Sequence, residues 1–592
     1  MCGICGEFLL GPGKQADAAR LRAMQQTIVH RGPNDDGQLV HGPCGLGFRR
    51  LSIIDLEGGH QPISNEDATV WVTLNGEIYN YPELRKELEE LGHQFQTHSD
   101  TEVIVHLYEE HGVDFPKRLR GMFGIALYDL KHNKFLLVRD RLGIKPIYVW
   151  QDSERIVYGS EIKALLAHPS VSSVPHLPGV NEFLVLRHSV TPDTMFAGIQ
   201  KLPPASVLEV GTDGKVQTRT YWQMRHSAPP IRNMAEAVDA VERALVDAVE
   251  CHLLADVPLG MFLSGGLDSS VIAALVQQRS SRPVVCFTAS FKGEQDESPH
   301  AAAVARHLGA EHRLLPIEQP PPELLEELVW HLDEPIADPA CLPTFLLSRE
   351  AAKEVRVVLT GEGSDETNAG YSKFLRYHLY QRYPMAMKAA QWLGLKRFSQ
   401  YRPLCDANDE LERLLALDDV RGRVPTNKLK RVLDNCDSQD PTMRMLEYAR
   451  CTFMQEDLLM KVDRMTMAHG LEARVPFLDH SLAEVTARIH PSVLFEGKRT
   501  KAVLRAVAKK LLPDTIVQRR QHGFIVPLSG WFSGDFVSYV RGLLAPATIK
   551  KRGVVSAEDA AAILAAYEKD GSQARMVWSL VLLELWFRRF MD

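Results

Sequence analysis

A glycine- and serine-rich turn near the middle of the 592-residue chain has the composition of a phosphate-binding loop. The apolar run 257–263 leads into Ser264-Gly-Gly-Leu-Asp-Ser-Ser270, and a second apolar run follows. A turn between a strand and a helix presents backbone N–H groups where the helix dipole favours an anion, and Gly265 and Gly266 would let the main chain approach that anion. The turn lacks the GxxxxGK[ST] pattern of a Walker loop, so γ-phosphoryl transfer is not indicated. A chance Gly/Ser turn is the alternative.

A second cluster of chemically active residues lies about a hundred residues further on. Residues 355–359 read as a strand, and Thr360-Gly-Glu-Gly-Ser-Asp-Glu366 follows it with three carboxylates among five positions. Like charges repel unless a cation offsets them, and Mg²⁺ bound to nucleotide phosphates would be such a cation. We predict Asp268 and Asp365 as its ligands, since two parallel strand ends should place them side by side. A helix cap by Ser364 is the alternative for that residue.

Five motifs follow an early cysteine in order over the first 165 residues. They are His30-Arg31-Gly32-Pro33, Arg50-Leu51-Ser52-Ile53-Ile54, Asn75-Gly76-Glu77-Ile78-Tyr79-Asn80, Ser99-Asp100-Thr101-Glu102 and Arg139-Asp140-Arg141-Leu142-Gly143-Ile144-Lys145-Pro146. Together with Met1-Cys2-Gly3-Ile4-Cys5-Gly6 they resemble the class II glutamine amidotransferases. The Cys2–Cys5 pair has no second CxxC or Cys/His partner pair, so we set zinc and redox chemistry aside.

The resemblance implies a role for Cys2 and for the residues around it. In that family the initiator methionine is removed, and the α-amine, with a reference pKa of about 7.7–8.0, acts as base for the thiol. Asn75 and the Gly76 amide would form the oxyanion hole. In the implied glutamine site, Arg50 contacts the α-carboxylate of glutamine, and Glu77 and Asp100 contact its α-ammonium group. That site comprises Arg50, Leu51, Ile53, Asn75, Gly76, Glu77 and Asp100.

The second half resembles asparagine synthetase along nearly its whole length. The matching motifs are Ser264–Ser270, Asp333-Glu-Pro335, Gly361–Glu366, Asp463-Arg464-Met465, Glu472-Ala-Arg-Val-Pro-Phe-Leu-Asp479 and Lys498-Arg-Thr-Lys501. The resemblance implies that a carboxylate attacks the α-phosphorus of ATP, giving an acyl-adenylate and pyrophosphate. Ammonia released at Cys2 would then travel inside the protein and displace AMP.

Roles in the second half also come from this resemblance. We predict that Glu362 orients or deprotonates ammonia and that Lys501 neutralises phosphate charge, which completes the catalytic set of Cys2, Asn75, Gly76, Glu362 and Lys501. Asp268 and Asp365 are the predicted Mg²⁺ ligands, and ATP is the co-substrate. The predicted ATP-binding residues are Leu263, Ser264, Gly265, Gly266, Asp268, Ser269, Ser270, Ala289, Thr360 and Gly361.

The carboxylate acceptor stays open. Thr367-Asn368-Ala369 stands where the family has an apolar or aromatic residue and a glycine pair, and Gln521 stands where we expect lysine. We interpret both departures as surface changes, although they bear on the acceptor. The segment 333–344 is similar to a bacterial branch in which some members amidate peptide-like or natural-product acceptors. Aspartate is the default acceptor on family grounds.

Two rival functions are disfavoured by particular residues. A lactam-forming synthetase without glutaminase activity would lack the nucleophile, whereas Cys2, Arg50 and Asn75 all stand here. A non-catalytic regulator or binding partner would have lost Glu362 or the Ser264 loop.

The surrounding pattern predicts two domains. Short apolar runs separated by turn signals indicate a sheet-rich domain over 1–210 with a helix at 81–91, and 211–233 reads as a linker. From 234 to 592, helical stretches alternate with strands, as in a parallel sheet, and the chain after about 384 reads as almost wholly helical. The resemblance implies an α+β Ntn-hydrolase-type glutaminase sandwich (αββα) and an α/β ATP-pyrophosphatase domain with a helical C-terminal part.

Composition excludes several classes of protein. The formal charge of -7 is spread along the chain, and Arg519-Arg520 reads as solvated surface, so we expect no nucleic-acid partner. No apolar stretch reaches membrane-spanning length, and no secretory signal is visible. Nine cysteines without regular spacing fit a reducing compartment. We therefore expect a cytoplasmic enzyme that acts on glutamine, ATP and a carboxylate. A homodimer is one assembly that we consider, and the sequence alone does not determine the oligomeric state.

Overall fold

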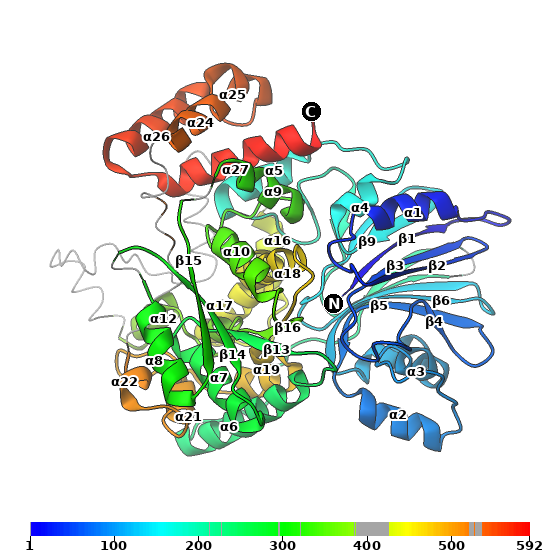
Figure 1. Cartoon of the computed structure of the whole chain (residues 1–592), viewed down its shortest axis with the longest axis horizontal. Coiled ribbons are helices and arrows are strands. Elements are labelled where there is room, and N and C mark those ends of the chain that lie inside the picture. The colour runs from blue at the N-terminus through cyan, green and yellow to red at the C-terminus, as the bar shows by residue number, and fades with distance from the viewer. Residues whose placement is uncertain are drawn as a thin grey trace.

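The N-terminal part of the chain folds into two antiparallel sheets of six strands each (Figure 1). The computed structural model describes residues 2–592 except 212–213, 227, 294–295, 320, 384, 386–425, 520–525, 527 and 529–534. The first sheet runs β10 (Ile199–Lys201), β8 (Tyr148–Gln151), β9 (Arg155–Gly159), β1 (Gly3–Leu9), β3 (Cys44–Arg50), β2 (Asp35–His41). The second runs β12 (Val216–Thr220), β11 (Ser206–Val210), β7 (Lys134–Arg139), β6 (Gly121–Asp129), β5 (Val70–Ile78), β4 (Ile63–Ser64).

These sheets stack face to face with helices on both outer faces. Aromatic side chains fill the space between them, and the Phe8 and Phe135 rings stack with centroids 5.1 Å apart. Strand β1 is buried along its whole length because both of its faces are covered. The outer helices are α1 (Ala18–Gln26) and α4 (Ile162–Leu166) on the first sheet and α2 (Tyr81–Glu90) and α3 (Val103–His111) on the second (Figure 1). The predicted αββα sandwich is confirmed.

A parallel five-stranded sheet organises the second part of the chain. Its order is β15 (Glu311–Pro316), β14 (Val285–Ser290), β13 (Leu259–Phe262), β16 (Val357–Leu359), β17 (Glu472–Arg474). Successive residues point to opposite faces, so Val358 joins one core and Leu359 the other. Both faces are covered by helices, as parallel sheets require, and this predicted architecture is confirmed.

Helices surround the parallel sheet and continue to the C-terminus. One face is covered by α6 (Met234–His252), α7 (Leu267–Arg279), α8 (Ser298–Leu308) and α21 (Ala502–Ala508), the other by α9 (Glu323–Leu332), α10 (Cys341–Ala351) and α18 (Met460–Met467). The last helices lie at one end of the molecule, with the buried helix α27 (Ala574–Phe590) against α9 (Figure 1). The other described helices are η1 (Gly112–Lys117), α5 (Leu177–Leu186), α11 (Ser364–Thr367), α12 (Ser372–Arg382), α16 (Thr426–Asp434), α17 (Pro441–Ala449), η2 (Arg450–Leu459), η3 (Pro476–Leu478), α19 (His480–Ala487), α20 (Pro491–Leu494), α22 (Asp514–Val517), α24 (Asp535–Leu543), α25 (Pro546–Arg552) and α26 (Ala557–Asp570).

The structure differs from the sequence prediction at two strands. β17 lies in the region that we expected to be helical, and it pairs parallel with β16 at the edge of the sheet. β12 lies inside the expected linker 211–233 and pairs antiparallel with β11, so it extends the N-terminal sheet. Within the described ranges, no helix combines the length and the apolar character needed to cross a membrane.

Candidate active site

The topological switch point of the parallel sheet lies between β13 and β16. The chain moves from β13 toward β14 on one side of this point and from β16 toward β17 on the other. In the β13–β16 register Leu259 lies opposite Val357 and Met261 opposite Leu359. The predicted neighbourhood of these two strand ends is confirmed. Open α/β sheets bind ligands in this crevice, outside the carboxyl ends of the strands.

Lys501 joins the two aspartates that follow these strands. Its Nζ lies 2.6 Å from Asp268 Oδ2 and 2.7 Å from Asp365 Oδ1, and Ser364 Oγ donates to Asp268 Oδ1 at 2.8 Å. Burial alone would lower the pKa of Lys501, but the charges of Asp268 and Asp365 raise it. A buried ammonium group is thus held between two carboxylates at the switch point.

The loop after β13 is held in shape by its own side chains. Gly266 N donates to Ser264 Oγ at 3.2 Å, the Ser264 and Ser269 hydroxyls lie 3.1 Å apart, and Ser270 Oγ donates to Gly266 O at 2.6 Å. Gly265 has a φ of +72°, and a Cβ there would lie 2.4 Å from a backbone nitrogen of helix α8. Only glycine fits this turn, and residues 266–269 at the start of α7 line the cavity beside it.

A cavity of about 240 Å³ opens beside the two loops. Glu362 and Asp365 line it with eight of the predicted nucleotide-binding residues, which are Leu263, Ser264, Gly266, Asp268, Ser269, Ala289, Thr360 and Gly361. Gly265, Ser270 and Lys501 are not part of its wall; Ser270 contacts Gly266, and Lys501 contacts the two aspartates. The structure brings the predicted residues to one place, whereas their individual roles stay predictions.

Three cations in the cavity wall were not found by sequence reasoning. Lys461, in α18, Arg505, in α21, and Arg519 all line the cavity. Arg519 Nη1 donates to Gly265 O at 3.0 Å, and its Nη2 lies 2.5 Å from Glu297 Oε1. Our interpretation of Arg519 as solvated surface was wrong, because its side chain is only 16% exposed; Arg520 lies outside the described residues. All three cations come from segments far from the loops, so no local pattern marks them.

Glu362 projects into the cavity next to Lys461. The distance between Lys461 Nζ and Glu362 Oε1 is 3.9 Å, and the lysine also contacts Asp338 Oδ2 at 2.8 Å. Burial within the cavity wall raises the pKa of Glu362. The next acidic residue, Glu366, is buried beside Asp365, which raises its pKa to about 7. A carboxyl group that holds a proton more tightly is a better base when ionised.

Cys2 lies at the end of β1, between the two sheets of the sandwich. Its backbone N donates to Asn75 Oδ1 at 3.2 Å, and its Sγ lies 3.9 Å from Leu51 O. Asn75 Nδ2 in turn donates to Ser160 Oγ at 3.3 Å. Burial raises the pKa of the Cys2 thiol to about 11, so the thiolate needs a base next to it. Gly76 has a φ of +151°, and a Cβ would lie 1.9 Å from Met122 O, so no side chain fits there.

The three charged residues of the predicted glutamine site surround Cys2 in different environments. Arg50 donates to the carbonyl oxygens of residues 54, 55 and 56 and so holds that loop closed. Asp100 Oδ2 accepts from Ile78 N at 2.8 Å, and burial raises the pKa of Asp100 to about 6. Glu77 Oε2 is buried and lies 3.4 Å from Arg474 Nη2, and it accepts no hydrogen bond from the described part of the chain. A carboxylate oxygen with hydrogen-bonding capacity left over suits an incoming ammonium group.

Leu51 and Ile53 lie where the two parts of the chain meet. Both are almost fully buried, and they form a small apolar cluster with Val357 of β16 and Met467 of α18. These two residues therefore connect the wall of the predicted glutamine site with strand β16 and helix α18 of the second part of the chain.

A buried network of charges joins the sandwich to the parallel-sheet part. Arg31 donates to both oxygens of Asp463, at 2.8 and 3.1 Å. Glu161 accepts from Arg31 Nη1 at 2.9 Å and lies 2.9 Å from Arg464 Nη1. The second nitrogen of Arg464, Nη2, lies 3.3 Å from Asp333 Oδ2. The motifs around Arg31, Asp333 and Asp463, to which the sequence analysis assigned no separate role, thus form the contact between the two halves.

We had interpreted the departures after Glu366 as surface changes, and the structure shows that this interpretation was wrong. Thr367, Asn368 and Ala369 are 3%, 2% and 0% exposed. Ala369 has a φ of +54°, in the region that favours glycine, and it stands where the family resemblance leads us to expect glycine. Gln521 lies outside the described residues.

Comparison with known proteins agrees with this arrangement. Residues 1–222 match the glutamine amidotransferase domain family, and residues 240–588 match the asparagine synthase family. Asparagine synthetase [glutamine-hydrolyzing] 1 of Bacillus subtilis is 33% identical, with 99% of this chain and 96% of the relative covered. A putative asparagine synthetase of Mycobacterium bovis is 32% identical over 100% of this chain and 98% of the relative. Amidase chyE of Penicillium rubens is 27% identical over 94% of this chain and 93% of its own length.

The fold and the two sites define a ligase that uses glutamine and ATP to amidate a carboxylate. The chain belongs to the asparagine synthase family, with a class II glutamine amidotransferase domain at its N-terminus.

Proposed function

We propose that the chain converts aspartate to asparagine, with glutamine as nitrogen donor, through an acyl-adenylate. The observation that carries this proposal is the cluster of Lys501, Asp268 and Asp365 at the switch point, beside a cavity lined by the phosphate-binding loop. We assign glutamine hydrolysis to the sandwich domain, which includes β12 and so reaches residue 220, and we assign synthesis to the domain at 234–592. The names of the two bacterial relatives support aspartate as the acceptor.

Glutamine hydrolysis begins at Cys2. Once Met1 is removed, the α-amine of Cys2 takes the thiol proton, and Sγ attacks the glutamine amide carbon. Asn75 and the Gly76 N–H stabilise the negative oxygen of the tetrahedral intermediate. The C–N bond then breaks, the amine returns a proton to the leaving ammonia, and water hydrolyses the thioester to glutamate. Glu77 and Asp100 hold the α-ammonium group of the substrate, and Arg50 holds its α-carboxylate.

Adenylation takes place at the switch point. A carboxylate oxygen of the acceptor bonds to the α-phosphorus of ATP, and the bond to pyrophosphate breaks. The backbone N–H groups at the start of α7 bind phosphate. The positive charge of Lys501 offsets the negative charges of Asp268 and Asp365, which would otherwise repel the phosphate. Asp268 and Asp365 offer the carboxylate oxygens that Mg²⁺ prefers, and their charges with Lys501 sum to a net negative site, so the donor set fits. When bound, Mg²⁺ would neutralise phosphate charge.

Amide formation depends on Glu362. Ammonia attacks the acyl carbon, the C–O bond to AMP breaks, and Glu362 accepts the proton that the nitrogen loses. Its position in the cavity wall, with a raised pKa, supports this role. Ammonia passing inside the protein from Cys2 escapes protonation by bulk water and arrives at high effective concentration.

A different carboxylate acceptor is the second candidate. The buried Thr367-Asn368-Ala369 segment lies directly after the cavity residues Glu362 and Asp365, so a change there can reach the acceptor pocket. The similarity to a fungal protein named as an amidase supports an acceptor other than aspartate. The chemistry of activation and amide transfer would be the same.

A panel of carboxylates tests the proposal. The full chain is incubated with ATP, Mg²⁺ and glutamine, and pyrophosphate release is measured for aspartate, for other amino acids and for peptide-like or sugar acids. We expect aspartate to give pyrophosphate and asparagine in equal amounts. Pyrophosphate release with another acid and not with aspartate would identify that acid as the acceptor. Pyrophosphate release with none of the acids would overturn the proposed reaction.

A further inference from the structure

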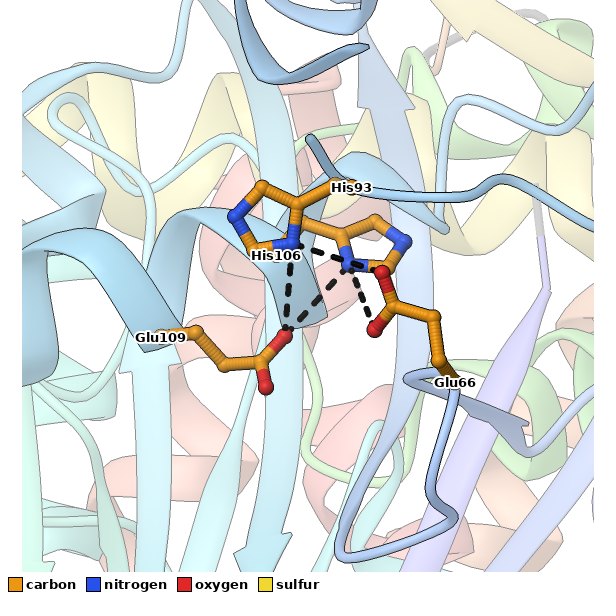
Figure 2. A group of neighbouring side chains, drawn as sticks. All are labelled: Glu66, His93, His106 and Glu109. Carbon is orange, nitrogen blue, oxygen red and sulfur yellow. Dashed lines mark ion pairs between the residues drawn. The ribbon is translucent and has the colours of Figure 1, made fainter. Parts of the chain in front are cut away.

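Two histidines and two glutamates meet on the outer face of the sandwich, away from Cys2 and from the parallel sheet. Figure 2 shows Glu66, His93, His106 and Glu109 turned toward one another. Glu66 comes from the turn between β4 and β5, His93 follows α2, and His106 and Glu109 lie on α3. Four ligand-type side chains thus converge from three separate segments.

His106 is the least satisfied member of this cluster. Its side chain is fully buried, and neither ring nitrogen forms a hydrogen bond within the described part of the chain. The His106 and His93 ring centroids lie 4.8 Å apart, and Phe95 covers His106 with centroids 4.5 Å apart. A buried imidazole with unpaired nitrogens is costly unless something binds it. Its Nδ1 is directed at the two carboxylates (Figure 2).

The spacing of the ligand atoms fits one metal ion. His106 Nδ1 lies 3.5 Å from Glu66 Oε2 and 3.4 Å from Glu109 Oε2. His93 Nδ1 lies 3.5 Å from Glu66 Oε1 and 3.7 Å from Glu109 Oε2. Ligands about 2.0–2.1 Å from a tetrahedral ion are separated by about 3.3–3.4 Å. We propose that Glu66, His93, His106 and Glu109 bind one Zn²⁺-type transition-metal ion.

Carboxylates behind the histidines give the arrangement of a metal site. His93 Nε2 lies 3.1 Å from Glu110 Oε1, and His106 Nε2 lies 3.8 Å from Glu102 Oε1. A metal-binding imidazole typically donates its second N–H to such a carboxylate, which leaves the other nitrogen unprotonated toward the ion. Both histidines have Nδ1 toward the cluster and Nε2 toward a carboxylate; His93 forms the hydrogen bond of this pattern, whereas His106 lies at ion-pair distance from its carboxylate.

The glutamates are also oriented by neighbours. Asn65 Nδ2 donates to Glu109 Oε1 at 2.8 Å, which leaves Oε2 toward the histidines. Gln94 N donates to Glu66 Oε1 at 2.8 Å. The glutamate side chains are 34% and 31% exposed, so an ion can enter from solvent.

The donor set selects the kind of ion. Two imidazoles with two carboxylates suit Zn²⁺ and its neighbours, whereas Mg²⁺ and Ca²⁺ prefer oxygen ligands alone. The ion would tie the segment around His93 to helix α3. Because Asp100 and Glu102 precede that helix, the same ion would steady the side of the predicted glutamine site that holds Asp100. The alternative is a cluster of ion pairs in which the histidines are protonated.

Zinc binding by matched variants tests the proposal. The full chain, His93→Gln and His111→Gln are stripped with chelator and dialysed against Zn²⁺, and bound zinc is counted per chain. His111 is the control because it lies exposed at the end of α3, the helix that carries His106, and outside the cluster. We expect His93→Gln to bind one ion fewer than the wild type and His111→Gln to bind the same number. Counting a difference excludes zinc held elsewhere, for example at thiols.

Two further measurements make the outcome decisive. Glutamine hydrolysis in zinc-free buffer reports whether His93→Gln is folded. Zn²⁺ should raise the unfolding temperature of the wild type and of His111→Gln and leave that of His93→Gln unchanged. Glu110→Gln should weaken zinc binding about 10- to 100-fold, because it removes the carboxylate behind His93. Equal zinc content in the wild type and His93→Gln, with equal unfolding temperatures, would overturn the site and leave an ion-pair cluster.

Discussion

Burial controls the protonation of the acidic groups on which both sites depend. The pKa of Asp100 is raised to about 6 and that of Glu366 to about 7, and the pKa of Glu362 is raised as well. In each case the protein removes water from a carboxylate without supplying a full set of hydrogen bonds. Raised pKa values of this kind are typical of groups that accept protons or bind cations during a reaction.

Cys2→Ala should separate the two reactions. Without the thiol there is no nucleophile for the amide, so glutamine hydrolysis should be lost, while synthesis from added ammonium salts continues. Both rates are measured on the full chain with the same acceptor. A tag left on the N-terminus should act in the same way, because it converts the α-amine into an amide that cannot accept a proton. Glutamine-driven synthesis near the wild-type rate in Cys2→Ala would refute the nucleophile assignment.

Glutamine use should fall at acidic pH through Asp100. In the proposed mechanism the ionised carboxylate attracts the α-ammonium group; burial raises its pKa to about 6, so protonation below that pH would remove the attraction. The value of kcat/KM for glutamine hydrolysis should therefore drop about tenfold per pH unit below about 6. Asp100→Asn should lower kcat/KM by about 10- to 100-fold and lose this acid limb. An unchanged acid limb in Asp100→Asn would assign the titration to another group.

Glu362→Gln tests the order of events at the synthetase site. The amide keeps the shape of the side chain and loses the basic group, so ATP and acceptor should bind while amide formation is lost. Glu362→Asp should be intermediate, because a displacement of about 1 Å can cost a hundredfold in rate. Pyrophosphate–ATP isotope exchange, with acceptor and no nitrogen source, is the measurement. If exchange disappears together with amide formation, Glu362 acts in adenylation or acceptor binding instead.

At the scale of elements, the parallel strands position the synthetase site. The loops after β13 and β16 carry the glycine- and serine-rich turn and the carboxylates, and their pairing register brings Asp268 and Asp365 within reach of Lys501. The lysine itself comes from the start of α21, more than a hundred residues later, with a φ of +57°. Three segments must therefore fold together before the site exists.

Asp268→Asn and Asp365→Asn should each weaken ATP activation. Each change removes one carboxylate charge from the predicted Mg²⁺ ligands, so Mg²⁺-dependent pyrophosphate formation should fall while glutamine hydrolysis persists. Asp239→Asn, at an exposed position of α6, serves as the control. Both activities are measured across a range of Mg²⁺ concentrations. Unchanged Mg²⁺-dependent ATP cleavage in both variants would refute the assignment of Asp268 and Asp365 as Mg²⁺ ligands.

Much of this arrangement was predictable from the sequence because it is encoded locally. Strands β13 and β14 are apolar runs, and the turn after β13 has glycines and serines at fixed spacing. The strand β17 was missed because two of its three residues, Glu472 and Arg474, are charged, although both are fully buried. Their burial depends on partners from other segments, such as Arg474 with Glu77 at 3.4 Å. Lys461 and Arg519 were missed for the same reason.

At the scale of the whole molecule, the two halves are joined by buried charges rather than by a simple apolar surface. Arg31, Glu161, Asp463 and Arg464 are all at most 2% exposed. Paired charges of this kind give little net stability but impose one geometry, since any misfit leaves a charge without a partner. We infer that the network fixes how the two sites face each other, as an internal path for ammonia requires.

Asp463→Asn should uncouple the two halves. The amide keeps the shape but removes the charge opposite Arg31, so the two halves should no longer be held in one arrangement. We expect glutamine hydrolysis and ammonia-driven synthesis to persist, while glutamine-driven synthesis falls and more glutamine is hydrolysed per amide formed. Arg31→Lys provides a second variant, since lysine keeps the charge and cannot form the bidentate contact. Glu89→Gln, which breaks the exposed pair with Arg85, is the control. Equal amounts of glutamate and amide product in both interface variants, at wild-type rate, would show that this network does not couple the sites.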